Sequence, residues 1–413
     1  KDADLDSLIK SPLLKINKID YNQINKPENI FIGRKNSLGI DLTEENNIEV
    51  FSNLKNIENV KPTSVVNGSD KFTNLKEVIV SPYNRLKILG EVYYADDNVT
   101  KEAISKLTSY SKEWINTDLD YRIDIVNNFA NLLENNYHTL VSCCVKEAGK
   151  TIKDSIADIR EAIDFCRYYA EEAKIIFKEK HLPGPTGEKN IYQFKGRGLT
   201  CVISPWNFPI AIFVGQMIAS LVCGNVTIVK PAEQTSNLSY VIFKLLLNAG
   251  LPKNAAALIL GKGEEICPLI FSNINLQNVV FTGSLETAKV IQKQLHKRDD
   301  LINFIAETGG LNCLIADSSA LSEHIVDDVV NSAFNSAGQR CSACRILCIE
   351  ENVYEKTLSM LEQAVETLLV SSPEHISTDV GPVIDKEAKN KIINYLNNFK
   401  KNNSKVQVRN EGY

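Results

Sequence analysis

Phe-Pro-Ile-Ala-Ile-Phe-Val-Gly-Gln-Met-Ile-Ala-Ser-Leu-Val-Cys-Gly-Asn-Val-Thr-Ile-Val occupies positions 208–229 and decides the fold of this chain. Gln216 interrupts the apolar run, and Gly224 with Asn225 forms a turn signal. A membrane-spanning helix needs about twenty predominantly apolar residues without such breaks. The stretch therefore predicts a buried helix followed by a buried strand.

Strands and helices alternate outward from this stretch. Apolar runs of strand length lie at 200–204, 225–229, 256–260, 278–282 and 302–306, and stretches of helix length lie at about 209–223, 234–248, 264–272 and 284–296. This alternation predicts an α/β fold, a parallel sheet with helices on both faces that binds ligands at the carboxyl ends of its strands. The alternation restarts after residue 310, with strands at 312–316 and 345–350 and helices at 321–337 and 352–370. The restart predicts a second α/β domain.

The region before the alternation is organised differently. Residues 1–75 are rich in Asn, Lys and Ile with weak periodicity, which predicts an extended linker or wrap-around segment with short elements. Residues 76–97 resemble a strand pair around a turn, and 100–180 are predicted helical. The last of these helices carries an apolar stripe at helical spacing, made of Ile152, Ile156, Ile159, Ile163 and Cys166.

Composition excludes several classes of function. The chain has 413 residues, which is enough for two or three domains, and its 44% apolar and 23% charged residues are ordinary for a soluble protein. A formal charge of −5 predicts no nucleic-acid partner. Ten irregularly spaced cysteines without a signal peptide favour the reducing cytoplasm. The N-terminus has no initiator Met, so we interpret the chain as a fragment or a processed product.

The stretch 331–345, Asn-Ser-Ala-Phe-Asn-Ser-Ala-Gly-Gln-Arg-Cys-Ser-Ala-Cys-Arg, presents Cys341 as a candidate nucleophile. Gly338 would let the backbone turn sharply, so that Cys341 lies in a loop with free N–H groups for an oxyanion. One alternative is an inert buried thiol. Another is a redox or zinc pair with Cys344. Zinc needs a second pair of ligands, and no suitable pair occurs among His138, His181, His296, His324 and His375.

Two polar motifs follow predicted strands in the first domain. Asn207 lies between prolines in Ser-Pro-Trp-Asn-Phe-Pro, where its amide could stabilise an oxyanion or simply cap a rigid turn. Lys230 and Glu233 in Lys-Pro-Ala-Glu-Gln-Thr could bond a ribose diol, and a carboxylate there favours NAD over NADP. The alternative for Glu233 is a helix first turn.

Two further motifs follow later strands. Ser284 in Phe-Thr-Gly-Ser precedes a helix and could hold a pyrophosphate or act only as an N-cap. Glu307 in Glu-Thr-Gly-Gly could act as a general base if the cleft is partly desolvated, or lie in a surface turn. Each motif is weak alone.

Taken in order and spacing, Pro-Trp-Asn-Phe-Pro, Lys-Pro-Ala-Glu-Gln-Thr, Phe-Thr-Gly-Ser, Glu-Thr-Gly-Gly and Gly-Gln-Arg-Cys resemble the aldehyde dehydrogenase superfamily. The segments 34–42, 147–151, 306–310 and 336–343 resemble the proline utilisation A group, whose members combine proline dehydrogenase and glutamate-semialdehyde dehydrogenase. The resemblance implies an NAD-binding domain at 76–305, part of an oligomerisation flap at about 185–200, and a catalytic domain at 306–413.

The resemblance also implies roles for single residues. Cys341 would attack L-glutamate γ-semialdehyde, the Asn207 amide would stabilise the oxyanion, and Glu307 would activate the water that releases glutamate. Ser342 and Glu147 match positions near the substrate. NAD is the implied cofactor and no metal is implied; the positions that match cofactor contacts are Ile203, Trp206, Lys230, Glu233, Gly263, Gly283, Ser284 and Thr308.

The chain also departs from the family pattern. A later Glu-x-Phe motif, the loop that holds the substrate carboxylate and the last flap strands are missing before Tyr413, and no flavin barrel precedes residue 1. We therefore expect an incomplete catalytic domain, and a silent remnant that binds only NAD or a partner is the alternative function. A thiol-redox protein using Cys341 and Cys344 is a third possibility. A homo-oligomer or a separate proline dehydrogenase are the expected partners.

Overall fold

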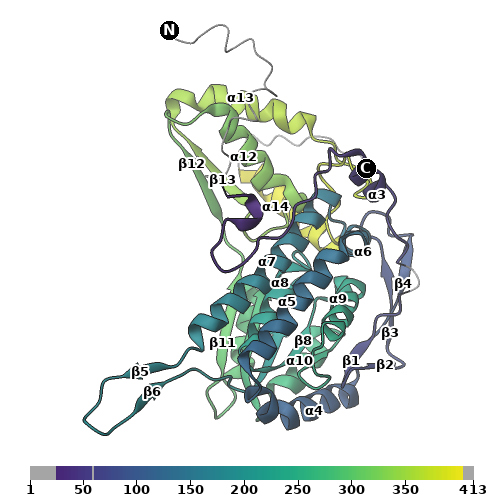
Figure 1. Cartoon of the computed structure of the whole chain (residues 1–413). Coiled ribbons are helices and arrows are strands. Elements are labelled where there is room, and N and C mark those ends of the chain that lie inside the picture. Colours follow the sequence, from purple (N-terminus) through teal and green to yellow (C-terminus); the bar gives the residue numbers. More distant parts are fainter. Residues whose placement is uncertain (1–24, 58–59, 403–413) are drawn as a thin grey trace.

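A seven-stranded sheet forms the centre of the larger body of the molecule (Figure 1). The structure is a computed structural model, and it describes residues 25–57 and 60–402. The strand order in the sheet is β11-β10-β7-β8-β9-β1-β2. The strands are β1 (Ser64–Val66), β2 (Ser69–Lys71), β7 (Leu199–Ile203), β8 (Val226–Lys230), β9 (Ala256–Leu258), β10 (Leu276–Gly283) and β11 (Asn303–Thr308).

The predicted alternation is confirmed in this sheet. Strands β7 to β11 pair in parallel, and every residue of β7 and β8 is buried, as expected for strands covered on both faces. Residues 211–222 and 226–230 form the buried helix and buried strand expected from the opening stretch. The sheet runs through β11 to Thr308, so a domain boundary between residues 305 and 306 would cut a strand that is bonded to β10 along its length.

Strands β1 and β2 lie inside the segment predicted as a linker. β1 pairs antiparallel with β9, and β2 pairs antiparallel with β1, so the segment supplies one edge of the sheet. Two three-residue strands are too short to produce a periodic pattern, which is why the sequence did not reveal them. Residues 1–24 of the predicted linker lie outside the described residues.

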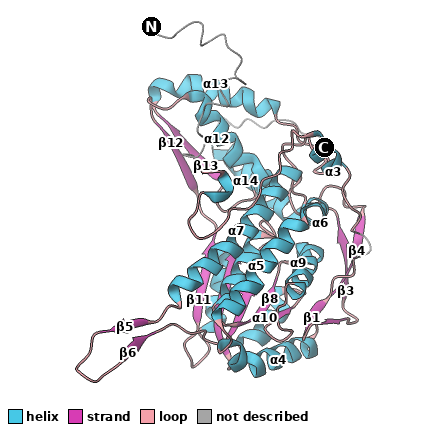
Figure 2. Cartoon of the chain, viewed as in Figure 1, coloured by secondary structure: helices cyan, strands magenta, loops and turns pink. Residues whose placement is uncertain are grey.

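Helices surround the sheet, as Figure 2 shows. Helix α8 packs on β7 and β8, with α5 and α7 behind it, while α4 packs against β8, β9 and β1. Several helices begin at a capping side chain, for example Thr151 before α7. The helices of this body are α4 (Asp97–Ile115), α5 (Leu119–Asn135), α6 (Tyr137–Cys143), α7 (Ile152–Ile176), α8 (Ala211–Val222), α9 (Ser236–Asn248), α10 (Gly263–Phe271) and α11 (Leu285–Leu295), with the π-helix η3 (Cys144–Ala148) and the 3-10 turn η4 (Glu233–Thr235).

The predicted restart after residue 310 produces a second, smaller α/β unit. Strands β12 (Asn312–Ala316) and β13 (Cys344–Ile349) pair in parallel, and helices α12 (Ser322–Phe334) and α13 (Glu351–Thr367) pack together with them. A small core of Ala316, Ile325 and Val329 joins them. The turn η5 (Asn335–Gly338) leads from α12 to Cys341.

The remaining elements are peripheral. The expected strand pair is confirmed as β3 (Lys76–Val80) and β4 (Ile88–Tyr93). A second antiparallel hairpin, β5 (Lys180–Leu182) and β6 (Asn190–Tyr192), projects from the body in Figure 1 and begins earlier than the predicted flap. The other elements are η2 (Pro27–Asn29), α3 (Glu45–Ser52) and α14 (Lys386–Asn402). Within the described ranges, we find no helix with both the length and the apolar character needed to cross a membrane.

Candidate active site

The carboxyl ends of four parallel strands bring most of the predicted cofactor positions together. Ile203 at the end of β7 lies opposite Lys230 at the end of β8. On β10 and β11, Gly283 lies opposite Thr308 in the same way. Neighbouring strands lie about 4.8 Å apart, so these positions form one edge. This is the edge at which open parallel sheets bind ligands.

Lys230, Glu233 and Gly263 form one hydrogen-bonded group at this edge. The Lys230 Nζ lies 2.5 Å from Glu233 Oε1, and the Gly263 N–H donates to the same oxygen at 2.9 Å. Burial alone would raise the pKa of Glu233, but the charge and hydrogen bond of Lys230 outweigh it and lower that pKa. Glu233 is therefore held as a carboxylate, which suits it to accept from a ribose hydroxyl.

Ser284 and Trp206 complete the edge. The Ser284 hydroxyl accepts from the Thr287 N–H at 3.1 Å, so Ser284 is the N-cap of α11. Ser284 therefore caps α11, and the N-terminus of this helix of eleven residues lies at the same edge. Trp206 lies half-buried in the turn after β7.

Cys341 and Glu307 line the same cavity, which has a volume of about 530 Å³. Both residues are exposed, so the partly desolvated setting expected for Glu307 is not seen among the described residues. The rest of the wall comes from the body and combines apolar side chains with charged and polar ones: Phe165, Tyr169, Ile212, Val280 and Ile305 are apolar, and Lys195, Arg197 and Gln216 are polar. Ser342, the neighbour of Cys341, is also exposed.

Asn207 is tied to the loop that carries Cys341. Its Nδ2 donates to the Gln339 carbonyl at 2.9 Å, two residues before Cys341 in the chain. Its own carbonyl accepts from the Lys150 Nζ at 3.1 Å. The side-chain amide of Asn207 is therefore bonded to the cysteine loop, and its backbone carbonyl is held by Lys150.

Asp154, in the first turn of α7, is bonded to the loop that leads to Cys341. Its carboxylate accepts from the Ser336 N–H at 2.7 Å and from the Ser336 hydroxyl at 3.1 Å, and it pairs with Arg340. Ser336 and Ala337 both have φ near +54°, a left-handed conformation that non-glycine residues rarely adopt. These contacts fix a strained turn immediately before Cys341.

Asp158, one turn further along α7, holds the Asn207 segment. Its Oδ1 accepts from the Ala211 N–H at 2.8 Å, and Oδ2 lies 3.2 Å from the Lys150 Nζ. Burial would lower the pKa of Lys150, but the nearby Asp158, Cys144 and Asp154 together outweigh it and raise that pKa. Lys150 therefore stays charged although it is almost fully buried.

These positioning residues were not found from the sequence. Asp154 and Arg340 are 186 residues apart, and Asp158 and Ala211 are 53 residues apart, so no local pattern links them. One signal in the sequence could have indicated them: Asp154 and Asp158 lie four residues apart beside the apolar stripe of α7. A carboxylate on a buried helix face requires a partner.

The structure corrects the interpretation of Glu147 as a residue near the substrate. Glu147 is 1% exposed in η3, and its two carboxylate oxygens accept from the N–H groups of Asn237 and Leu238 at 2.8 and 2.9 Å. Those groups belong to the first turn of α9, so Glu147 caps that helix. It is absent from the lining of the cavity that contains Cys341 and Glu307.

Cys341 and Cys344 are not the close thiol pair of this unit. The Cys344 Sγ lies 3.4 Å from the Ile346 carbonyl, whereas Cys313 and Cys348 have their sulfur atoms 3.5 Å apart. In the part of the chain that the structure describes, no group of three or more His, Cys, Asp or Glu side chains is arranged to hold a metal ion.

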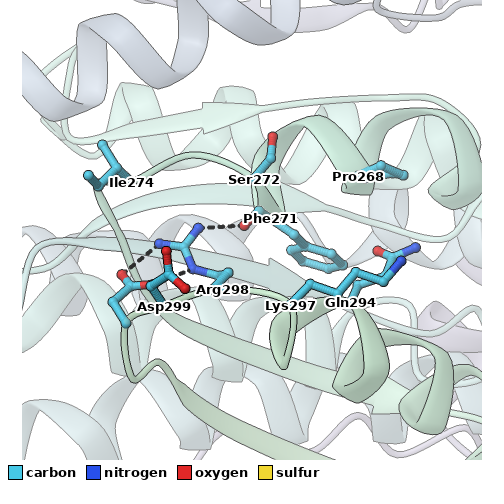
Figure 3. A pocket seen from close by; sticks show the side chains of 9 residues that line it. Pro268, Phe271, Ser272, Ile274, Gln294, Lys297, Arg298 and Asp299 are labelled. Carbon is cyan, nitrogen blue, oxygen red and sulfur yellow. Dashed lines mark hydrogen bonds and ion pairs between the residues drawn. The ribbon is translucent and has the colours of Figure 1, made fainter.

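Another cavity, of about 520 Å³, lies between the ends of α10 and α11 (Figure 3). Arg298 lines this cavity, but its guanidinium already donates hydrogen bonds to the Asp300 carboxylate and to the backbone carbonyls of Phe271 and Asn273. An arginine whose donors are used in this way fixes the turn after α11. We therefore assign the chemistry to the cavity with Cys341.

Comparisons with known proteins identify a matching family and similar structures. A model of the "Aldehyde dehydrogenase family" matches residues 72–412. The "Bifunctional protein PutA" of Klebsiella aerogenes is 37% identical over 95% of this chain and 30% of its own length, so the chain spans about a third of such relatives. A "1-pyrroline-5-carboxylate dehydrogenase" of a Geobacillus species is 34% identical over 87% of this chain and 72% of its own length. The solved structure of a 1-pyrroline-5-carboxylate dehydrogenase from Thermus with bound NAD is 27% identical, with a TM-score of 0.86, over 93% of this chain and 77% of that one.

Proposed function

Since the chain belongs to the aldehyde dehydrogenase family, we propose that it oxidises L-glutamate γ-semialdehyde, the open form of 1-pyrroline-5-carboxylate, to L-glutamate with NAD. The observation that carries the proposal is the shared cavity of Cys341 and Glu307, beside the strand ends that present the cofactor positions. The names of the similar proteins support the choice of substrate.

Cys341 is the proposed nucleophile. As a thiolate it attacks the aldehyde carbon and forms a hemithioacetal. The Asn207 amide carries two N–H groups, and Gln339 accepts from one of them, which holds the amide beside the cysteine loop. The other N–H, with the Cys341 backbone N–H, would stabilise the oxyanion.

A bound NAD would supply the hydride acceptor, and loss of hydride from the hemithioacetal would leave Cys341 as a thioester. Glu307 would then take a proton from a water molecule that attacks the thioester, and glutamate would leave. Its place in the same cavity as Cys341 supports this role. Ser342 is proposed to contact the substrate carboxylate.

The residues at the strand ends fit a dinucleotide. Lys230 and Glu233 would hold the adenosine ribose, with the charged Glu233 disfavouring a 2′-phosphate. The N-terminus of α11 with Ser284 would receive the pyrophosphate. Ile203, Trp206, Gly263, Gly283 and Thr308 are the other proposed contacts. The preference for NAD over NADP is part of the proposal.

The decisive experiment measures NADH absorbance with glutamate semialdehyde for the wild type and for Cys341→Ala. We expect NADH formation only with the wild type. Glu323→Ala, which changes an exposed carboxylate of the same unit, is the matched control. Equal rates for the wild type and Cys341→Ala would reject the proposal and favour the silent remnant that binds only NAD or a partner.

Partners and location are part of the proposal as well. We infer a reducing compartment, the cytoplasm, because all ten cysteines are free thiols.

A separate proline dehydrogenase as the source of substrate is suggested by the bifunctional name of the relatives. A homo-oligomer formed through the projecting β5–β6 hairpin is the second proposed assembly. Gel filtration with and without residues 180–192 would test the oligomer.

A further inference from the structure

Two thiols lie side by side on the smaller unit, outside the cavity described above. Cys313 is on β12 and Cys348 is on the neighbouring strand β13, with their sulfur atoms 3.5 Å apart. Both side chains are exposed. By contrast, Cys143, Cys144, Cys166, Cys201 and Cys267 are buried and no thiol partner within hydrogen-bonding distance is described for them.

The two thiols share one face of the two-stranded sheet. Cys313 lies opposite Ile346, and Ile315 lies opposite Cys348, so these four residues point the same way. Leu314 and Leu347 point to the other face, where they pack on the small core with α12 and α13. The thiol face is exposed at Ile315 and Ile346 as well. Among the described residues, nothing blocks a small oxidant from reaching the pair.

We propose that Cys313 and Cys348 form an oxidation site that a hydroperoxide converts into a cross-strand disulfide. One thiolate attacks the peroxide oxygen, the O–O bond breaks, and an alcohol leaves, which gives a sulfenic acid. The second thiolate attacks that sulfur, the S–S bond forms, and hydroxide leaves as water. Two thiols thus lose two electrons and two protons to one hydroperoxide.

Closing the pair requires the two sulfur atoms to approach each other. A disulfide holds its sulfur atoms about 2.05 Å apart, and the present separation is 3.5 Å. The two cysteines are diagonal rather than opposite neighbours, because each faces an isoleucine across the ladder. Because the bond links diagonal positions, it would draw β12 along β13. A disulfide that is exposed, as these side chains are, is readily reduced.

The residue before Cys313 transmits this movement to Cys341. The Asn312 Nδ2 donates to the Cys341 carbonyl at 2.6 Å and to the Ala343 carbonyl at 3.1 Å. A shift of β12 moves this amide away from the cysteine loop. Oxidation of the pair would thus loosen Cys341, and this consequence, unlike the disulfide itself, rests on the proposed function.

The first experiment identifies the disulfide by mass. The full chain is treated with tert-butyl hydroperoxide, its remaining thiols are alkylated, and the digest is mapped by mass spectrometry. We expect a cross-linked peptide pair containing Cys313 and Cys348 that dithiothreitol releases. Cys344→Ser should keep the cross-link, and Cys348→Ser should lose it. A cross-link from Cys313 to Cys344, or separate oxidation of Cys313 and Cys348, would overturn the site.

The second experiment measures the effect on Cys341 and separates the two proposals. Loss of the neutral hydrogen bond from Asn312 to the Cys341 carbonyl alone corresponds to about a fivefold change in the fraction of protein with Cys341 in place. We expect peroxide to lower the rate of aldehyde oxidation by about this factor in the wild type, reversibly with dithiothreitol, and this reversible part to be absent in Cys348→Ser. If the chain oxidises no aldehyde, the rate at which Cys341 is alkylated, before and after peroxide, is compared between the wild type and Cys348→Ser instead. Equal reversible changes in both proteins would reject the coupling while the mapped disulfide stands.

Discussion

Removing the carboxylate of Asp154 should release the turn that precedes Cys341. Asp154 accepts from the Ser336 N–H and hydroxyl and pairs with Arg340. Ser336 and Ala337 sit in the left-handed region, at a cost of about 1–2 kcal/mol each. Each hydrogen bond to a charged group contributes about 1.5–3 kcal/mol. The contacts of Asp154 therefore outweigh the strain of the turn.

We expect Asp154→Ala to lower the free energy of unfolding by about 3–5 kcal/mol, the range found when one partner of a buried pair is removed. The relaxed turn displaces Cys341, and a displacement of about 1 Å costs roughly a hundredfold in rate. Urea unfolding gives the first quantity, and NADH formation from glutamate semialdehyde gives the second.

Two further variants make this test specific. Asp154→Asn can still accept from the Ser336 N–H but loses the charge that faces Arg340, so it should fall between the wild type and Asp154→Ala, and it serves if the alanine variant does not fold. Glu323→Ala removes one side of an exposed pair that lies 3.7 Å from Lys356 and should cost about 0–1 kcal/mol. If Asp154→Ala behaves within about 0.5 kcal/mol of Glu323→Ala, the typical spread of surface substitutions, the reasoning about the turn is refuted.

Three other predictions concern single positions. Burial raises the pKa of Glu147 to about 8, so between about pH 5 and 8 the native state holds a proton that the unfolded chain has lost. The free energy of unfolding should therefore fall as the pH rises through this range, by at most about 1.4 kcal/mol per pH unit. Thermal melts of Glu147→Gln should show a flatter pH profile than those of the wild type. Asn207→Ala should reduce kcat by about a hundredfold or more with little change in NAD affinity, which steady-state kinetics and a binding titration would check. Gly338→Ala should destabilise by at least about 1–2 kcal/mol in urea unfolding, because the residue has φ +69° and a Cβ would lie 2.8 Å from the Ala333 carbonyl.

The parallel core was predictable because its signal is local. Strands β7 and β8 are buried on both faces, so they appear as continuous apolar runs between helix-length stretches. Ile203, Lys230, Gly283 and Thr308 could be expected at one edge because parallel strands end together, and the register confirms that they do. The short strands β1 and β2 had no such signal.

Side-chain pairing across long separations could not be predicted. Glu147 was expected near the substrate, yet its partners Asn237 and Leu238 lie about ninety residues later. Its neighbours in the chain do not reveal that a helix N-terminus lies beside it. The same holds for Asp154 and Arg340, whose pairing depends on how the two units meet. Sequence patterns identify which groups can react, and the packed structure decides which groups hold them.

The first two turns of α7 have one more consequence. Asp154 is hydrogen-bonded to the segment that ends at Cys341. Asp158 is bonded to the segment that carries Asn207, directly at Ala211 and through Lys150. The Cys341 sulfur and the Asn207 amide are thus both positioned relative to the same helix, α7, even though they come from separate units. A motion that moves the two units relative to each other would carry the proposed nucleophile and the proposed oxyanion-binding amide together, so their mutual alignment would survive changes in the width of the cavity.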